Sequence, residues 1–393
     1  MESRIYFDHA ATTPLDPRVR QAMEPYLNGS FGNPSSMHAP GRQAHAAVDE
    51  ARADVAALIG AHPGEIVFTA SGTEADNLAL RGVLEGQGEG DHLIVSAFEH
   101  PAVIETAKHL ERLGVEVTLL PVGDDGIVSP AAVASALRAH TRLVSIMTAN
   151  NVVGTIQQVH ELAELVHRHG ALFHTDAVQA AGKVPLDVTR TPIDLLSLSA
   201  HKLHGPKGVG ALFVRTGVHL RPIVFGGGQE RGLRSATENV AGIVGFGHAA
   251  DIARSEMGAE TARLVGLREQ LYEGISESIP NAYFIGDRYR RLPGHLCLGF
   301  AGQEGEAVKL LLKLDEQGIA VSSGSACSAN HVGEPSYALT AMGLDPIRAR
   351  GSLRITLGRG STQKEVDRLL EVLAPTVQSL QTVASHAGFA SRS

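Results

Sequence analysis

Short apolar runs alternate with longer amphipathic stretches along most of the chain. After a short extended start, helical patterns occupy residues 43–59, 73–84, 101–113, 130–139 and 159–169. Buried strands are typically short runs rich in Val, Ile, Leu and Phe, and such runs lie at residues 66–69, 93–96, 115–119, 143–147, 171–174, 194–199 and 209–214. This alternation predicts βαβ units and a mainly parallel sheet covered by helices on both faces.

A run of three glycines at residues 226–228 interrupts the alternation. A long helical stretch from about residue 240 to 278 then leads to a second set of elements. This set comprises a strand at 296–300, a helix at 304–317, a strand at 319–322, and helices near Ser336 and Lys364. A chain of 393 residues exceeds what one core usually serves. We expect a large domain at residues 12–255 and a small α/β domain from residues 1–11 and 256–393.

Composition and charge narrow the class of protein. The net charge is −8 and no Lys/Arg run occurs, which argues against nucleic-acid binding. No stretch approaches the roughly 18 apolar residues of a membrane helix, and the first residues lack the apolar region of a signal peptide. We expect a cytoplasmic protein that does not bind membranes. The two cysteines are too few for a disulfide framework, His160-Glu161 lacks the zinc-protease spacing, and we expect no metal site.

A lysine follows the apolar run at residues 194–199. Lys202 precedes a Gly-Pro turn, beyond which lies Lys207. Open α/β sheets place their chemistry at the carboxyl ends of the strands. A partly desolvated amine there can lose its proton and form a Schiff base. A lysine in such a turn is, however, most often a solvated surface charge, so this stretch alone does not choose between Lys202 and Lys207.

Two more motifs stand at strand ends. Gly72 and Thr73 follow the first apolar run and open a helix, where backbone N–H groups and a hydroxyl can bind an anion; an ordinary N-cap would look the same. Asp176 ends another strand, and a buried carboxylate needs a partner, which a protonated pyridine nitrogen would provide. Gln179 could then hydrogen-bond the ring oxygen. The alternative for Asp176 is a capping residue before a loop.

His100 and the pair Asn150-Asn151 also follow predicted strands. The flat ring of His100 could stack on a planar cofactor, although a capping or core histidine is the commoner outcome. Each motif is weak alone. Because all of them fall at the same edge of one predicted sheet, together they indicate a ligand-binding site there.

These motifs, in this order, resemble the NifS/IscS-type cysteine desulfurases, which belong to the class V aminotransferase group of pyridoxal-phosphate enzymes. The resemblance runs from Tyr6 to Arg359, nearly the whole chain. It rests on the segments 6–14, 150–151, 175–179, 199–208, 226–237 and 322–327. It implies the pyridoxal-phosphate fold type I, in which a mainly parallel seven-stranded sheet flanked by helices is joined to a smaller α/β domain.

The resemblance implies how pyridoxal 5′-phosphate is held. Lys202, rather than Lys207, would bind it covalently and act in catalysis. Asp176 would pair with the ring nitrogen and Gln179 with the ring oxygen, while His100 would stack on the ring as a further catalytic residue. The residues implied for the phosphate are Gly72, Thr73, Ser199 and His201. Thr237 would reach the phosphate of a neighbouring subunit, which implies a homodimer.

The resemblance also implies the substrate groups and the reaction. Asn151 would approach cofactor and substrate, and Asn33 and Arg354 would hold the carboxylate of L-cysteine. Cys327, in a run of small polar residues expected to be a mobile loop, would take the sulfur as a persulfide while L-alanine leaves. The sulfur would pass to an acceptor protein for iron–sulfur cluster assembly or tRNA thiolation. Cys297 lies in an apolar strand and is expected in the core.

Alternatives to the desulfurase remain open. A selenocysteine lyase would use the same residues, and a class V aminotransferase would need the lysine and aspartate but not Cys327. A non-catalytic scaffold partner is opposed by the intact set of Lys202, Asp176 and Cys327. Two positions depart from the family pattern: Val152 stands where many members have glutamate near the substrate channel, and Gln229 stands where some have histidine.

Overall fold

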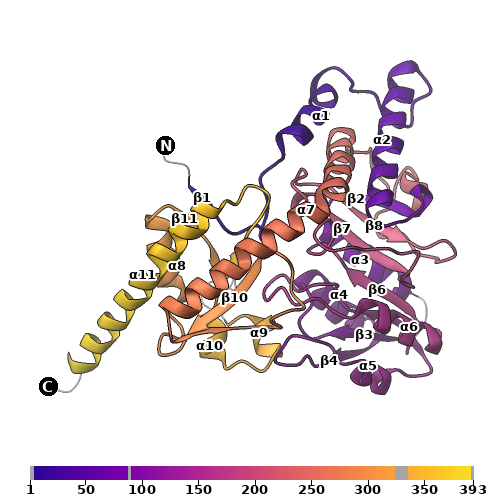
Figure 1. Ribbon diagram of the computed structural model, residues 1–393. Helices are drawn as coiled ribbons and strands as arrows, with labels where there is room; N and C mark the ends of the chain where they lie inside the picture. Colours follow the sequence, from indigo (N-terminus) through magenta and orange to yellow (C-terminus); the bar gives the residue numbers. More distant parts are fainter. Residues whose placement is uncertain (1–3, 87–89, 324–334, 391–393) are drawn as a thin grey trace.

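The computed structural model describes residues 4–86, 90–323 and 335–390. A seven-stranded sheet forms its larger part (Figure 1). In spatial order the strands are β2 (Ile66–Thr69), β8 (Gly210–Val214), β7 (Leu195–Ser199), β6 (Leu172–Asp176), β5 (Thr141–Ser145), β3 (His92–Ser96) and β4 (Glu116–Leu120). β8 runs antiparallel to β2 and β7, and the remaining pairs are parallel. The predicted mainly parallel seven-stranded sheet is confirmed.

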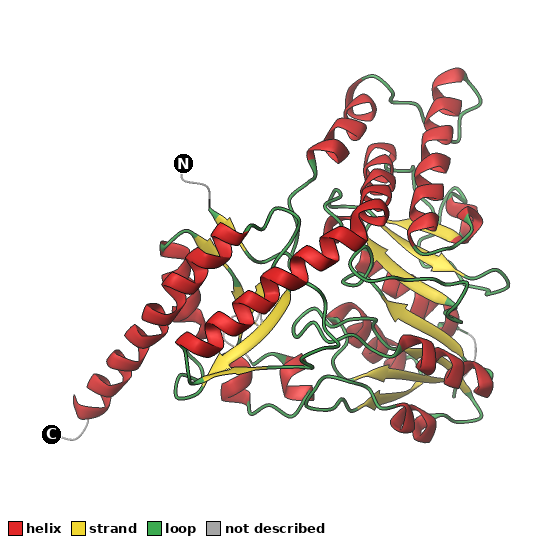
Figure 2. Ribbon diagram, in the orientation of Figure 1, coloured by secondary structure: helices red, strands yellow, loops and turns green. Residues whose placement is uncertain are grey.

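Helices cover both faces of this sheet (Figure 2). Apolar side chains on each face pack beneath these helices. Neighbouring residues of a strand point to opposite faces. Accordingly, Leu93 packs in the cluster beneath one layer of helices and Ile94 in the cluster beneath the other. One layer contains α3 (Gly72–Leu84) and α4 (Pro101–Arg112). The other contains α2 (Ala39–Leu58), α5 (Pro130–Ala136), α6 (Val159–His169) and the first half of α7 (Val240–Ser278).

A second group of elements has its own apolar core. Its antiparallel sheet consists of β12 (Ser322–Ser323), β13 (Leu353–Thr356), β10 (His295–Phe300) and β9 (Ala282–Phe284). Near the chain start, β1 (Ile5–Tyr6) pairs with β11 (Ile319–Ala320). The helices α8 (Ala307–Glu316) and α11 (Gln363–Ala390) and the second half of α7 pack in this core, whereas α9 (Tyr337–Ala341) and α10 (Pro346–Arg350) pack against the main core. In the described part of the chain, no helix combines the length and apolar character needed to span a bilayer.

The start of the chain departs from the predicted extended segment. It contains a further helix, α1 (Pro17–Asn28), which begins where the Asp16 carboxylate accepts a hydrogen bond from the backbone N–H of Arg18. Only Val19 of α1 is buried, so the helix lacks the apolar stripe that would have revealed it. The predicted strand at 319–322 is divided between two sheets, as β11 and β12. α7 crosses residue 255 as one continuous helix, and the proposed domain limits stay a proposal.

Candidate functional site

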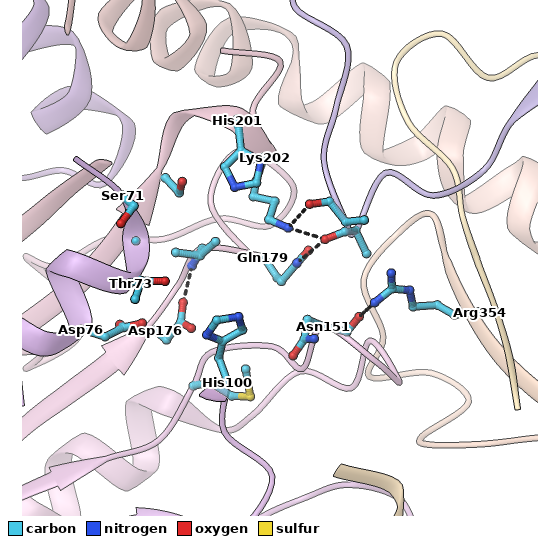
Figure 3. Close-up of a pocket in the computed structure, with 16 residues that line it drawn as sticks. Ser71, Thr73, Asp76, His100, Asn151, Asp176, Gln179, His201, Lys202 and Arg354 are labelled. Carbon is cyan, nitrogen blue, oxygen red and sulfur yellow. Dashed lines mark hydrogen bonds between the residues drawn. The ribbon is translucent and has the colours of Figure 1, made fainter. Parts of the chain in front are cut away.

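Polar residues gather at one edge of the central sheet. β3, β5, β6 and β7 are parallel, and β2 shares their direction because β8 is antiparallel to both β2 and β7. The carboxyl ends of these strands border a cavity of about 280 Å³ (Figure 3). Its lining includes the predicted residues Gly72, Thr73, His100, Asn151, Asp176, Gln179, Ser199, His201, Lys202 and Arg354. It also includes Ala10, Ala11, Ser71, Asp76, Met147 and Val178.

One end of the cavity is the N-terminus of α3. The hydroxyl of Ser71 accepts a hydrogen bond from the backbone N–H of Glu74 at 3.1 Å and caps the helix. A Cβ at Gly72 would come within 2.7 Å of Val178 Cγ2, so this close approach of backbone to side chain requires glycine. The remaining N–H groups of the first turn and the helix dipole favour an anion. With the Thr73 hydroxyl beside them, this end suits a phosphate.

Lys202 enters the cavity from the 3₁₀ turn η2 (Ala200–Lys202), which directly follows β7. Its Nζ atom donates hydrogen bonds to the carbonyl oxygens of Ala10 and Ala11, the latter at 2.7 Å. The side-chain amide of Gln179 donates to the same Ala10 carbonyl at 2.9 Å (Figure 3). The N-terminal segment therefore forms a wall of the cavity and contacts the lysine amine directly.

Two carboxyl groups and an imidazole lie across the cavity from this wall. Asp176 is buried, and one of its carboxylate oxygens accepts a hydrogen bond from the Val178 N–H at 2.9 Å. Burial raises the pKa of Asp176, although the nearby charges of His100 and Lys202 oppose this shift. His100 is the N-cap of α4 through its Nδ1 atom, and burial lowers its pKa. A partner with a proton to share, such as a pyridine nitrogen, would stabilise the Asp176 carboxylate.

The second carboxyl group belongs to Asp76, which was not predicted. Burial, with a contribution from the Asp176 charge, raises its pKa well above the ordinary value. Asp76 lies three residues after Thr73 on α3, and residues at this spacing share a helix face. That spacing was the available signal. An acidic residue on a helix is usually exposed, however, so the spacing alone would not have placed Asp76 in a cavity.

Arg354 reaches the cavity from β13, in the second group of elements. Its side chain is fully buried; Nη1 donates to the Asn151 carbonyl at 2.9 Å and Nη2 to a carboxylate oxygen of Asp8 at 2.8 Å. Its Nε atom has no hydrogen-bond partner among the residues that the structure describes. A guanidinium with donors to spare at a cavity wall can bind a carboxylate through two hydrogen bonds.

Two other site residues predicted from the sequence, Asn33 and Thr237, do not line this cavity. Asn33 is exposed, and its side-chain oxygen accepts a hydrogen bond from the Ser35 N–H at 2.9 Å. Thr237 is also exposed and borders a separate hollow that Thr69 helps to line. Cys327 lies outside the described residues. Val152, one of the two departures from the family pattern, is 1% exposed and packs in the main apolar core rather than lining the cavity.

The donor set of the cavity fits pyridoxal 5′-phosphate. An amine that can bind an aldehyde, a buried carboxyl group for a ring nitrogen, an imidazole and a helix N-terminus for a phosphate all line one space.

Comparison with known proteins gives consistent matches. The family model described as "Aminotransferase class-V" matches residues 5–369. A relative from Dictyoglomus turgidum named "Cysteine desulfurase IscS" is 45% identical over 387 residues, covering 98% of each chain. A solved structure described as a "NifS-like protein" has a TM-score of 0.89 at 38% identity, covering 95% of this chain and 99% of its own. Another, "SspA in complex with cysteine", has a TM-score of 0.79 at 36% identity, covering 90% and 98%.

Proposed function

This chain belongs to the aminotransferase class-V family, and from that membership we propose that it is a pyridoxal-phosphate-dependent cysteine desulfurase. Its reaction converts L-cysteine to L-alanine and leaves the sulfur on the enzyme. The observation that carries the proposal is the cavity in which the Lys202 amine, the buried Asp176 carboxyl and the N-terminus of α3 meet. Relatives of nearly the same length carry the name of this activity.

The residues that would hold the cofactor follow from the chemistry of the cavity wall. Lys202 Nζ would bind its aldehyde carbon, Asp176 its ring nitrogen and Gln179 its ring oxygen, with His100 against the ring. The phosphate would lie among Gly72, Thr73, Ser199 and His201. When bound, pyridoxal phosphate supplies an electron sink for bond cleavage at the α-carbon of an amino acid.

The protein residues would then bind the substrate and move its protons. Arg354 and Asn33 would hold the carboxylate of cysteine, and Asn151 would approach the cofactor and the substrate. Once the amine of L-cysteine has displaced it from the cofactor, Lys202 would act as the base and acid that moves the α-carbon proton, because an amine held close to that carbon can serve in both roles.

Cys327 would remove the sulfur. Its thiolate would attack the substrate sulfur, so that an S–S bond forms on Cys327 while the C–S bond breaks. The electron pair of the C–S bond would stay with the substrate carbon, which takes up a proton and leaves as part of L-alanine. The resulting persulfide would pass to an acceptor protein for iron–sulfur cluster assembly or tRNA thiolation.

A homodimer is part of the proposal. Phe225 is 82% exposed, and the neighbouring Val224 pairs with Arg234, three residues before Thr237. An exposed phenylalanine next to this segment supports a subunit interface there, which would let Thr237 reach the phosphate of the other subunit. The cytoplasmic location inferred from the sequence stays a prediction.

Mass spectrometry of the protein after incubation with L-cysteine tests the proposal. We expect one added sulfur on Cys327, with L-alanine released. Cys327→Ala should keep the cofactor absorbance but acquire no sulfur, while Cys297→Ser serves as the matched control because Cys297 is buried. Undiminished alanine release from Cys327→Ala would overturn the desulfurase, and amino transfer to a keto acid would indicate an aminotransferase. Faster turnover of selenocysteine than cysteine would indicate a selenocysteine lyase.

A further inference from the structure

The backbone before His100 is tied to the ends of two neighbouring strands. Glu99 is fully buried, and one of its carboxyl oxygens accepts a hydrogen bond from the hydroxyl of Ser96, the last residue of β3. The same oxygen accepts a hydrogen bond at 2.7 Å from the backbone N–H of Met147, which lies just beyond β5. Both bonds hold the loop where the chain leaves the sheet, and both act through the Glu99 side chain.

A further hydrogen bond reaches this loop from the second half of the chain. The hydroxyl of Tyr337 donates to the backbone carbonyl oxygen of Glu99, 238 positions earlier. Tyr337 is the first residue of α9, and its half-buried side chain packs against the main apolar core. In the sequence, Tyr337 follows Cys327 by ten positions. The loop that carries His100 is therefore in contact with the part of the chain that comes shortly after Cys327.

This bond complements two other constraints on His100. A peptide group is planar, so a hydrogen bond on the Glu99 carbonyl also fixes the backbone nitrogen of His100 in the same plane. On the other side, Pro101 keeps His100 out of the helical conformation, with φ at −58° and ψ at 147°. The ring is directed by the Ala102 N–H, which donates to its Nδ1 atom at 3.1 Å. Tyr337 thus acts on the side of His100 that the proline does not fix.

We propose that Tyr337 is a positioning residue for His100 and acts through the Glu99 carbonyl. The inference rests on the proposed function, in which His100, whose ring borders the cavity, lies against the cofactor (Figure 3). Tyr337 is not among the described residues that line the cavity, so its effect passes through this peptide group. Removing the hydroxyl takes a donor from a buried carbonyl, which is unfavourable, and the peptide gains by turning toward another donor. Such a turn carries His100 with it and loosens its ring.

The experiment measures how fast diethyl pyrocarbonate modifies His100 in cofactor-free protein, by peptide mass spectrometry. The reagent needs a free lone pair on an imidazole nitrogen, and the lone pair of Nδ1 is engaged by the Ala102 N–H. Tyr337→Phe removes the hydroxyl and keeps the ring. We expect His100 to react about 2- to 12-fold faster, the shift that loss of one hydrogen bond allows. Tyr289→Phe, at a tyrosine that is 86% exposed, is the matched control and should leave the rate unchanged.

Two histidines of the same protein serve as internal references. His45 is exposed, and its rate should be the same in all variants. His174 is fully buried and would react faster only if the fold as a whole loosened. The inference is overturned if the His100 rate is unchanged in Tyr337→Phe, or if the His174 rate rises as much as the His100 rate. Should Tyr337→Phe fail to fold, Tyr337→Met, which also lacks a hydroxyl, takes its place.

A second measurement separates this inference from the proposed function. With pyridoxal phosphate bound, Tyr337→Phe should change the circular dichroism of the cofactor absorption band, whereas Tyr289→Phe should not. A faster His100 reaction without any change in the dichroism would contradict the contact between His100 and the cofactor ring, and not the role of Tyr337. Protein that binds no cofactor would contradict the proposed function, while the His100 rates, measured without cofactor, still decide the inference.

Discussion

Replacing Arg354 by lysine tests how the substrate carboxylate is bound. Lysine keeps the positive charge but exchanges a planar fork for donors on a single nitrogen. In the structure, Nη1 already binds the Asn151 carbonyl and Nη2 the Asp8 carboxylate, while Nε has no partner among the described residues. A lysine ammonium has three donors. If two of them keep the contacts with Asn151 and Asp8, only one is left for the substrate carboxylate, whereas a guanidinium can offer it two hydrogen bonds.

The size of the effect follows from that lost bond. A hydrogen bond to a charged group contributes about 1.5–3 kcal/mol. Its loss predicts that the KM for L-cysteine rises about 10- to 150-fold in Arg354→Lys. The kcat should fall by much less, because in the proposed function Arg354 would contact the carboxylate and not the atoms that react.

Steady-state release of L-alanine, measured over a range of cysteine concentrations, checks this prediction. Arg359→Lys is the matched control: Arg359 also pairs with a carboxylate, that of Asp16 at 2.7 Å, but it does not line the cavity. The reasoning is refuted if Arg354→Lys lowers kcat at an unchanged KM, or if Arg359→Lys raises the KM equally. Thermal unfolding of both variants verifies that each remains folded.

Three further predictions concern stability, packing and assembly. Burial raises the pKa of Glu99 to about 8 from the ordinary 4.5, so its protonated form stabilises the fold below about pH 4.5 and this contribution is lost as the pH rises to 8. The unfolding free energy of Glu99→Gln relative to the wild type should therefore rise by about 1.4 kcal/mol per pH unit between pH 5 and pH 8, as measured by urea unfolding. A difference between the two proteins that does not change with pH would contradict this. Gly72→Ala should lower the unfolding free energy by about 1–3 kcal/mol, because the added methyl group would clash with Val178. Gly64→Ala should cause no such loss, because the space around Gly64 is open. Equal losses in the two variants would contradict the packing argument. Phe225→Asp should convert the proposed dimer to a monomer in light scattering, and a dimer that persists would contradict an interface at Phe225.

Much of the main sheet could be predicted from the sequence, because apolar runs bounded by turn residues are a local signal. The predicted run at residues 66–69 coincides with β2, and that at 194–199 differs from β7 by one residue. Lys202 and Asp176 became candidates because both follow such runs, although the choice of Lys202 over Lys207 came from the family resemblance. α1 was missed because a helix with one buried residue carries no such pattern.

Other parts of the site had no local signal. Ala10 and Ala11 act through backbone carbonyls, which every residue possesses, so nothing in their side chains marks them. Arg354 was identified only through the family resemblance, since a buried arginine on an apolar strand looks anomalous until Asp8 is placed beside it.

The sequence by itself determined which segments become strands, which polar residues follow them, and which family the chain resembles, because these depend on neighbours within a few positions. Only the tertiary structure decided which of those residues share a cavity. Lys202 meets a carbonyl 192 positions earlier in the chain, and Arg354 a carboxylate 346 positions earlier. Such contacts form when separate elements pack their apolar faces together, and the same packing removes water from Asp176 and Lys183 and so sets their proton affinities.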